Sequence, residues 1–337
     1  MKINKKILFI ILIIFTLILA LILILEKSKP TNKTSIRIGI STYKSNDTFI
    51  NDITKSIESS AKEFEKETGI QVTLDISSAK GSQRTQNEQI KRYISLNYDV
   101  ICVNLVDRTD ATSIIDSAIS ENIPIVFFNR EPVDEDIFRG ENIYYVGTDP
   151  RSTAILQSQI LIDAYIADKE KIDKNNDGIL QYVLLEGEMG HQDTIIRSEL
   201  SISKLTQYGI KMEKLQNGTA NWERSQAKAL MLQWLEVHGD NIEVVICNND
   251  DMALGASDAV EEMEIGNITI LGIDATSDGI QAVKDGKLLG TIDCNCHEQG
   301  NSIFKLASSL ALFSAPPDDM SFENDRYVKI IPKIFSH

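Results

Sequence analysis

The sequence predicts an α/β protein with two doubly wound, mainly parallel-sheet lobes joined by a hinge and preceded by one transmembrane helix. Short apolar segments alternate with segments of helical period from residue 35 to residue 292. Strands this apolar are buried on both faces, which is typical of parallel sheets. The alternation falls into two successive sets, so we expect two lobes with a ligand cleft between them.

The N-terminal segment predicts a membrane anchor. Three lysines in the first six residues precede an apolar run from 7 to 25, which is long enough to span a hydrocarbon core. The run ends without a small-residue cleavage site, and no cysteine follows to take a lipid. We therefore expect an uncleaved anchor at 1–27, a polar linker at 28–35 and an extracytoplasmic remainder at the cell membrane. A cleaved signal peptide is the alternative.

The outer region can be divided into elements in chain order. Ile50, Ile53 and Ile57 recur at helical spacing in segment 49–66, and Gly69 ends that helix. In the first set we expect strands at 35–41, 71–76, 100–105, 124–128 and 144–147, and helices at 49–66, 85–96 and 109–119. In the second we expect helices at 152–167, 194–208, 225–236, 252–263 and 279–284, and strands at 181–185, near Met212, and at 244–247, 268–273 and 289–292.

Composition excludes several classes of partner. The net charge of -15 opposes binding to nucleic acid or to an anionic membrane surface.

The four cysteines are too few and too unevenly spaced for a disulfide framework. Cys294, Cys296 and His297 could bind a soft metal, but one such cluster is a weak pattern.

The segment from Asp173 to Gln181 resembles the first part of an EF-hand calcium loop. Oxygen-bearing side chains fall at positions 1, 3, 5 and 9, with glycine at position 6. Position 12 is Leu184, inside an apolar strand, so the missing bidentate carboxylate must come from elsewhere in the chain. A solvated Asx-rich turn is the alternative interpretation.

Polar and aromatic side chains follow the ends of several predicted strands, where ligands bind in doubly wound folds. Amides, carboxylates and a guanidinium form paired hydrogen bonds to vicinal hydroxyls, and aromatic faces stack on a sugar ring. The set therefore suits a neutral polyol, although Asp47 and Asp193 could also cap helices and Arg197 could lie on the surface. Its members are Asp47, Phe49, residues 129–131, His191, Asp193, Arg197, residues 248–250 and Asp274, with Trp222 in a loop.

These segments resemble the bacterial periplasmic galactose/glucose-binding proteins. The resemblance covers residues 36 to the early 330s and implies the type-I periplasmic-binding-protein fold. It is carried by 38–49, 126–132 (VFFNREP), 144–149 (YYVGTD), 173–181, 187–193 (GEMGHQD) with Arg197, 219–222 (TANW), 242–250 (IEVVICNND) and 272–275 (GIDA). It implies a first lobe of 36–148 and 294–328 and a second of 149–293 and 329–337.

The resemblance also implies site residues. Hydrogen bonds to a hexose such as glucose or galactose would come from Asp47, Asn129, His191, Asp193, Arg197, Asn249 and Asp274, with Phe49 and Trp222 stacking on its faces. The calcium ligands would be Asp173, Asn175, Asp177, the Ile179 carbonyl, Gln181 and Glu243. Cys294 departs from the family, which has an amide there. A sugar hydroxyl would then lose its partner or turn to Asn295.

The predicted protein is thus a membrane-tethered hexose-binding protein and not an enzyme. Because the anchor would hold the lobes beside other membrane proteins, we expect lobe closure to signal to a membrane histidine kinase. The alternative partner is the permease of an ABC importer. A sugar hydrolase using Asp47 or Asp274 with His191 is a remote alternative, since no paired acid–base motif supports it.

Overall fold

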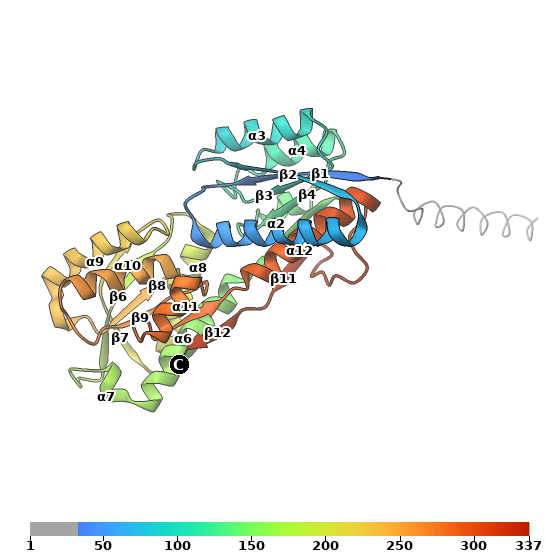
Figure 1. The fold of residues 1–337 in the computed structure, drawn as a ribbon. Coiled ribbons are helices and arrows are strands. Elements are labelled where there is room, and N and C mark those ends of the chain that lie inside the picture. Colours follow the sequence, from blue (N-terminus) through green and yellow to red (C-terminus); the bar gives the residue numbers. More distant parts are fainter. Residues whose placement is uncertain (1–32, 337) are drawn as a thin grey trace, which may run out of the picture.

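The computed structural model describes residues 33–336, which fold around two six-stranded sheets (Figure 1). The expected anchor at 1–27 and residues 28–32 of the expected linker lie outside the described residues. Within the described residues, no helix is both long enough and apolar enough to span a bilayer.

The first sheet is parallel throughout and has the strand order β11-β5-β4-β3-β1-β2. Helices α2 and α12 pack together on one face, and α3 and α4 cover the other (Figure 1). The strands are β1 (Ser35–Thr42), β2 (Gln71–Ser78), β3 (Val100–Val103), β4 (Ile125–Phe128), β5 (Ile143–Thr148) and β11 (Tyr327–Ile330); the helices are α2 (Thr48–Thr68), α3 (Gln83–Ser95), α4 (Thr112–Ser120), α5 (Asp134–Ile137) and α12 (Cys296–Phe313).

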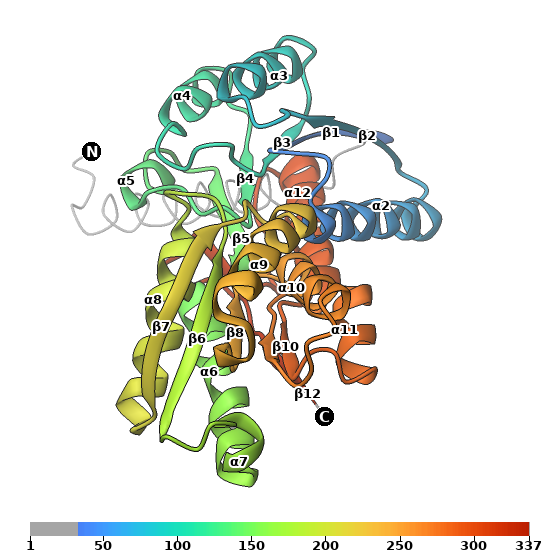
Figure 2. The same cartoon turned by 90° about the vertical axis from the view of Figure 1, so that its left-hand side faces the viewer.

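The second sheet has the order β12-β10-β9-β8-β6-β7 and is parallel except for the β10–β12 pair. Helices α6 and α8 pack together, as do α9 and α10 (Figure 2). The strands are β6 (Ile179–Glu186), β7 (Lys211–Thr219), β8 (Val244–Cys247), β9 (Thr269–Leu271), β10 (Gly290–Asp293) and β12 (Lys333–Ser336); the helices are α6 (Pro150–Ala167), α7 (Lys169–Ile172), α8 (Gln192–Tyr208), α9 (Arg224–His238), a 3-10 turn (Gly239–Asn241), α10 (Asp250–Glu262) and α11 (Ser277–Lys284).

Both sheets reverse their strand order at an equivalent place. In the first lobe β1 lies between β2 and β3, and in the second β6 lies between β7 and β8. Helices leave the sheet in opposite directions at such a point, which opens a crevice at the carboxyl ends of the strands. The two crevices face each other, because each lobe contributes strand-end residues to one hollow between them.

The chain passes between the lobes three times, and the last passage corrects the expected boundary. The first two follow β5 and β10, as expected at 148/149 and 293/294. The resemblance implied a third after residue 328, but β11 stays paired with β5 as far as Ile330. The third passage is therefore at 331–332, before β12 joins the second sheet.

Candidate functional site

A small hollow between the lobes collects most of the predicted ligand-binding residues. Its volume is about 30 Å³, room for little more than one water molecule, so the lobes must separate to admit a sugar. The first lobe contributes Tyr43, Asp47, Phe49, Ile50, Asn129 and Arg130, and the second contributes His191, Asp193, Arg197, Trp222, Asn249 and Asp274.

Two aromatic side chains reach the hollow from opposite lobes. Phe49 lies in the first turn of α2, and Trp222 follows β7. The Trp222 indole packs against the backbone at Gly187, where a Cβ would lie 2.1 Å from the ring. Its Nε1 is buried without a hydrogen-bond partner, so it remains available as a donor. One aromatic surface therefore lines each side of the hollow.

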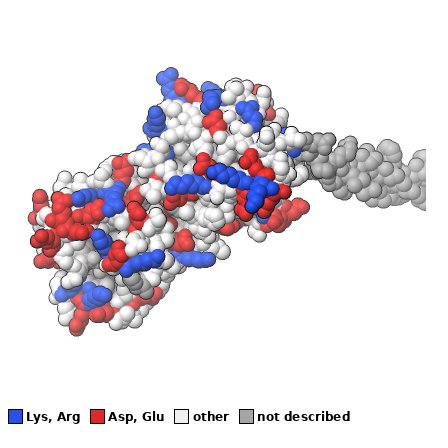
Figure 3. Space-filling view, viewed as in Figure 1, with Lys and Arg blue, Asp and Glu red and all other residues white. Residues whose placement is uncertain are grey.

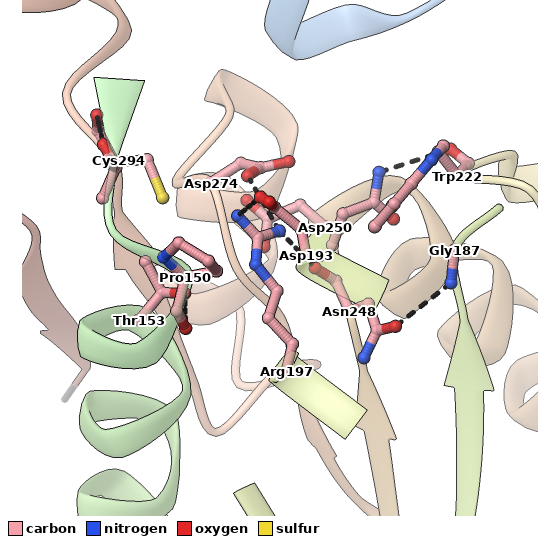
Figure 4. A network of polar contacts seen from close by, with 12 residues as sticks. Pro150, Thr153, Gly187, Asp193, Arg197, Trp222, Asn248, Asp250, Asp274 and Cys294 are labelled. Carbon is pink, nitrogen blue, oxygen red and sulfur yellow. Dashed lines mark hydrogen bonds and ion pairs between the residues drawn. The ribbon is translucent and has the colours of Figure 1, made fainter. Parts of the chain in front are cut away.

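Arg197 is the centre of a buried polar network in the second lobe (Figure 4). Its guanidinium is 2.9 Å from Asp193 Oδ2 and 3.9 Å from Asp274 Oδ1, and it donates to the Asn248 carbonyl at 2.8 Å. Burial raises the pKa of Asp274 well above its usual value, and raises that of Asp193 although Arg197 opposes the shift. The Arg197 Nε is buried without a partner. The network is thus fixed in position and retains unused donor capacity.

His191 is held as a neutral ring with a defined tautomer. Its Nδ1 accepts a hydrogen bond from the Asp193 backbone N–H at 3.0 Å, which leaves the proton on Nε2. Burial, together with Arg130 and Arg197, holds the pKa of His191 well below its usual value. The ring can therefore donate from Nε2 to an oxygen of a neutral ligand.

Asp47 and Asn249 combine helix capping with a place in the hollow. Asp47 Oδ1 accepts from the Ile50 N–H at 2.9 Å, and Asn249 Oδ1 accepts from the Met252 N–H at 3.0 Å. The cap at Asp47, expected only as an alternative, thus coexists with a site position. Asp193, in contrast, is not the cap of α8; that position belongs to His191.

Each lobe carries a matching buried asparagine behind the hollow. Asn104 Oδ1 accepts from the Tyr43 N–H after β1, and Asn248 Oδ1 accepts from the Gly187 N–H after β6. Asn104 also donates to Asn129 Oδ1 at 3.1 Å, which orients that site residue at its positive φ of 60°. The signal for this pair is present in the sequence, where Ile-Cys-Val-Asn (101–104) and Val-Ile-Cys-Asn (245–248) end corresponding strands.

The structure adds Tyr43 and Ile50 to the predicted set, and it places Arg130, already a member of the strand-end set, in the hollow. The Tyr43 hydroxyl donates to Asp47 Oδ2 at 2.6 Å, and the Arg130 guanidinium lies 3.6 Å from the centre of the Tyr43 ring. This stack fixes the orientation of the predicted Asp47 carboxylate. Position after a strand end is the only sequence signal that could have selected Tyr43.

Cys294 and Asn295 differ from what the resemblance suggests. The Cys294 side chain extends toward Asp274 (Figure 4), but it lies behind the hollow and does not line it. Burial raises the pKa of its thiol well above the usual value. Asn295 does not line the hollow either; its Oδ1 accepts from the Glu298 N–H and caps α12.

The comparison with protein families shows to which family the chain belongs. Residues 38–314 match the model of the periplasmic binding protein domain. This chain belongs to the periplasmic binding protein family. The relatives and solved structures named below are binding proteins, so the expectation that the chain is not an enzyme is confirmed.

Several relatives of this periplasmic binding protein cover most of its length. A D-galactose/methyl-galactoside binding periplasmic protein of Haemophilus influenzae is 36% identical over 87% of each chain. A ribose import binding protein of Bacillus subtilis is 27% identical over 85% of this chain and 84% of its own. An ABC transporter solute binding protein of Bacillus halodurans, solved with myo-inositol, is 26% identical with a TM-score of 0.74, covering 92% and 96% of the two chains.

Contacts across the cleft hold the lobes of this periplasmic binding protein together. Glu188 of the second lobe is 2.8 Å from Arg130 and 2.7 Å from Lys44 of the first. Thr48 donates to Asp251 Oδ2 at 2.7 Å across the same cleft. These contacts can form only when the lobes are close together, so the structure represents a closed arrangement.

The six predicted calcium ligands lie together where β6 and β8 begin. Glu243 Oε1 accepts from the Lys174 N–H at 2.6 Å, and Oε2 accepts from the Gln181 N–H at 3.1 Å, so this carboxylate faces the loop. Asn175 and Asp177 both contact the Gln181 amide. The loop and the distant glutamate thus form one cluster, as the resemblance implied.

One carboxylate oxygen in this cluster has no partner. Asp173 is fully buried; its Oδ2 accepts from the Gly178 N–H, and its Oδ1 makes no hydrogen bond. Lys169 Nζ lies 3.4 Å from Oδ2, but a buried carboxylate oxygen without a partner is costly, and a cation would satisfy Oδ1. Residues 33–336 include no group of three or more His, Cys, Asp or Glu side chains positioned as metal ligands. The calcium site, whose donor set would include two amides and a carbonyl, therefore stays a prediction.

Proposed function

We propose that this protein binds a hexose such as glucose or galactose between its lobes, outside the cytoplasm. The observation that carries the proposal is the pairing of Phe49 and Trp222 from opposite lobes around a buried polar network. Apolar faces of a pyranose suit the two aromatic surfaces, while its hydroxyls suit fixed carboxylates and amides. The galactose-binding relative, whose printed name states its ligand, supports this choice of sugar.

Polar groups in the hollow are positioned in advance for such a ligand. Arg197 and the neutral His191 would donate, whereas the caps keep Asp47 and Asn249 from turning away. Fixed groups lose little conformational freedom when the sugar binds. On the outer face seen in Figure 3, acidic and basic side chains both occur, and acidic ones gather over the far end of the second lobe.

Intrinsic fluorescence tests the proposal, because the chain has two tryptophans and one of them lines the hollow. The full-length protein is titrated with glucose, galactose, ribose, xylitol and myo-inositol. We expect saturable emission changes with a hexose, retained in Trp234→Phe and lost in Trp222→Phe. Trp234 is the matched control because it packs in the core of the second lobe. Absence of calorimetric binding to every aldohexose would overturn the proposal.

We also propose Ca²⁺ as a structural ion at 173–181 with Glu243. Its chemistry would be charge compensation for three carboxylates, those of Asp173, Asp177 and Glu243, far from the ligand. The partnerless Asp173 Oδ1 supports the proposal. Binding to the folded state alone would raise the melting temperature by mass action.

For the partner, we propose the permease of an ABC importer. Relatives named as ribose import and ABC transporter solute binding proteins support this role. Sensing through a membrane histidine kinase is a second candidate, supported by the apolar run at 7–25. Cross-linking in cells tests the two roles. Recovery of permease subunits supports import, whereas recovery of a kinase without a permease supports sensing.

A further inference from the structure

A second, larger cavity adjoins the hollow and is not explained by a free hexose. This outer cavity has a volume of about 380 Å³, against about 30 Å³ for the hollow. It shares Arg130, His191 and Asp193 with the hollow, so the two spaces meet at these side chains. Its lining consists of residues 106–109 and 130–131 from the first lobe and 188–193 from the second.

The walls of the outer cavity are braced by two arginines. Arg130 donates to the Val106 carbonyl at 2.8 Å, and Arg108 donates to the Glu131 carbonyl at 2.9 Å. Arg130 also bonds Glu188 across the cleft. Because the contact with Glu188 forms only when the lobes are close, the cavity persists in the closed arrangement and could stay occupied when the protein closes.

The lining offers unused contacts of two kinds. Gln192 Oε1 and Arg130 Nε are buried without partners, so they provide an acceptor and a donor that no protein group satisfies. Met189 is 88% exposed at the same cavity and offers an apolar surface. Apolar walls with a few converging polar groups are typical of ligand sites, and about 300 Å³ is the lower end of their size range.

The charges of the outer cavity favour a neutral occupant. Asp107, Glu131, Glu188 and Asp193 outnumber Arg108 and Arg130, and His191 is neutral. The guanidiniums are engaged with carbonyls and with Glu188. A phosphate or carboxylate group would face this acidic excess, whereas a hydroxyl-bearing group would not.

We propose that the outer cavity is a subsite for a neutral glycosyl or polyol group attached to the hexose. The attachment lies at the edge of the ring that faces His191 and Asp193, the side chains common to both spaces. This inference rests on the proposed hexose binding. The substrate class is thereby extended from monosaccharides to glycosides the size of a disaccharide.

Calorimetry on the full-length protein tests the subsite. Free glucose and galactose are compared with disaccharides that carry a second sugar on O1, O4 or O6. We expect one linkage to bind at least as tightly as the free hexose. Thr109→Trp, on an exposed part of the lining, should weaken that disaccharide tenfold or more and change the free hexose less than twofold. Gln192→Leu should weaken the disaccharide about fivefold, and Gln207→Leu, exposed on the same helix, should not.

The outcomes separate the two proposals. If the free hexose binds and every disaccharide binds more than a hundredfold more weakly, the subsite is wrong and hexose binding stands. Equal losses for both ligands in Thr109→Trp would also overturn the subsite. If neither a hexose nor a disaccharide binds, both proposals fail.

Discussion

The Thr291 hydroxyl donates a hydrogen bond to Asp250 Oδ1 at 2.6 Å and accepts one from the Ala275 N–H at 3.2 Å. Asp250 Oδ2 accepts from the Thr276 N–H at 2.8 Å. Between these contacts the chain passes through Asp274 with φ 121° and Ala275 with φ 52°. Asp250, which does not line the hollow, therefore holds the strained turn that presents Asp274 to the ligand.

This relationship predicts a pH dependence. Burial raises the pKa of Asp250 to about 7, whereas an unfolded aspartate titrates near 3.9. Between pH 4 and 7 the unfolded chain loses this proton while the folded protein keeps it, so the stability due to Asp250 falls as the pH rises and levels off above pH 7. Asp250→Asn should reduce this fall by roughly 4 kcal/mol, because the two pKa values differ by about 3 units at about 1.4 kcal/mol each.

Urea unfolding of both proteins at several pH values measures the difference. His191 contributes in the opposite direction, because its pKa is lowered, but it is present in both proteins and cancels. Parallel stability profiles would contradict the prediction. Asp250→Asn should also weaken hexose binding, since an amide cannot accept all three hydrogen bonds and the turn at Asp274 loosens.

Gly187→Ala should displace the Trp222 indole, because the added methyl would lie 2.1 Å from the ring. Overpacking of this kind costs about 1–3 kcal/mol, and we expect a hexose affinity at least tenfold weaker. Gly266→Ala is the control, since it has open space and no positive φ. Calorimetry measures the hexose affinity, and thermal melts measure the stability. Unchanged binding in Gly187→Ala would place the stacking surface elsewhere.

Removal of calcium should lower the melting temperature without abolishing hexose binding. The predicted ion satisfies Asp173 Oδ1, and Glu243 connects the loop to β8. Glu243→Gln should remove the response to chelator, whereas Asp240→Asn, a nearby exposed charge, should keep it. A melting curve that is identical before and after verified metal removal would argue against the site.

Cys294→Asn should tighten hexose binding by about fivefold, because an amide is one atom longer than the thiol and can extend from behind the hollow toward a sugar hydroxyl. An amide donates and accepts well where a thiol does both weakly, and one hydrogen bond contributes about 1 kcal/mol. Cys296→Ser is the control on the neighbouring half-buried cysteine. Equal affinities would mean that Cys294 only supports Asp274 from behind.

Strand ends were the most informative positions in the sequence. Asp47, Asn129, His191 and Asp274 could be assigned to one site because the carboxyl ends of parallel strands meet at a cleft. Tyr43 could not be assigned, and Arg130 was selected only by its place after a strand end, since the stack between the two depends on tertiary packing. The outer cavity was equally inaccessible, because its walls come from both lobes.

Helices and strands were predictable where apolar residues recur in the sequence with a helical or strand period. The pattern assigned no element after residue 292, yet α12, β11 and β12 follow. Helix α12 is buried around much of its circumference, from Gln299 to Leu312, so it has no clear polar stripe. Strand β7 was expected only near Met212 but runs to Thr219, and its polar sequence reflects a place at the edge of the sheet.

The two ends of the described chain belong to different bodies. Ser35 begins β1 in the first lobe, and Ser336 ends β12 in the second (Figure 2). Closure that brings the lobes together therefore changes the distance between Ser35 and Ser336. Energy transfer between fluorescent labels at these two positions would measure this distance. It would report on ligand occupancy without modifying a residue in the cleft.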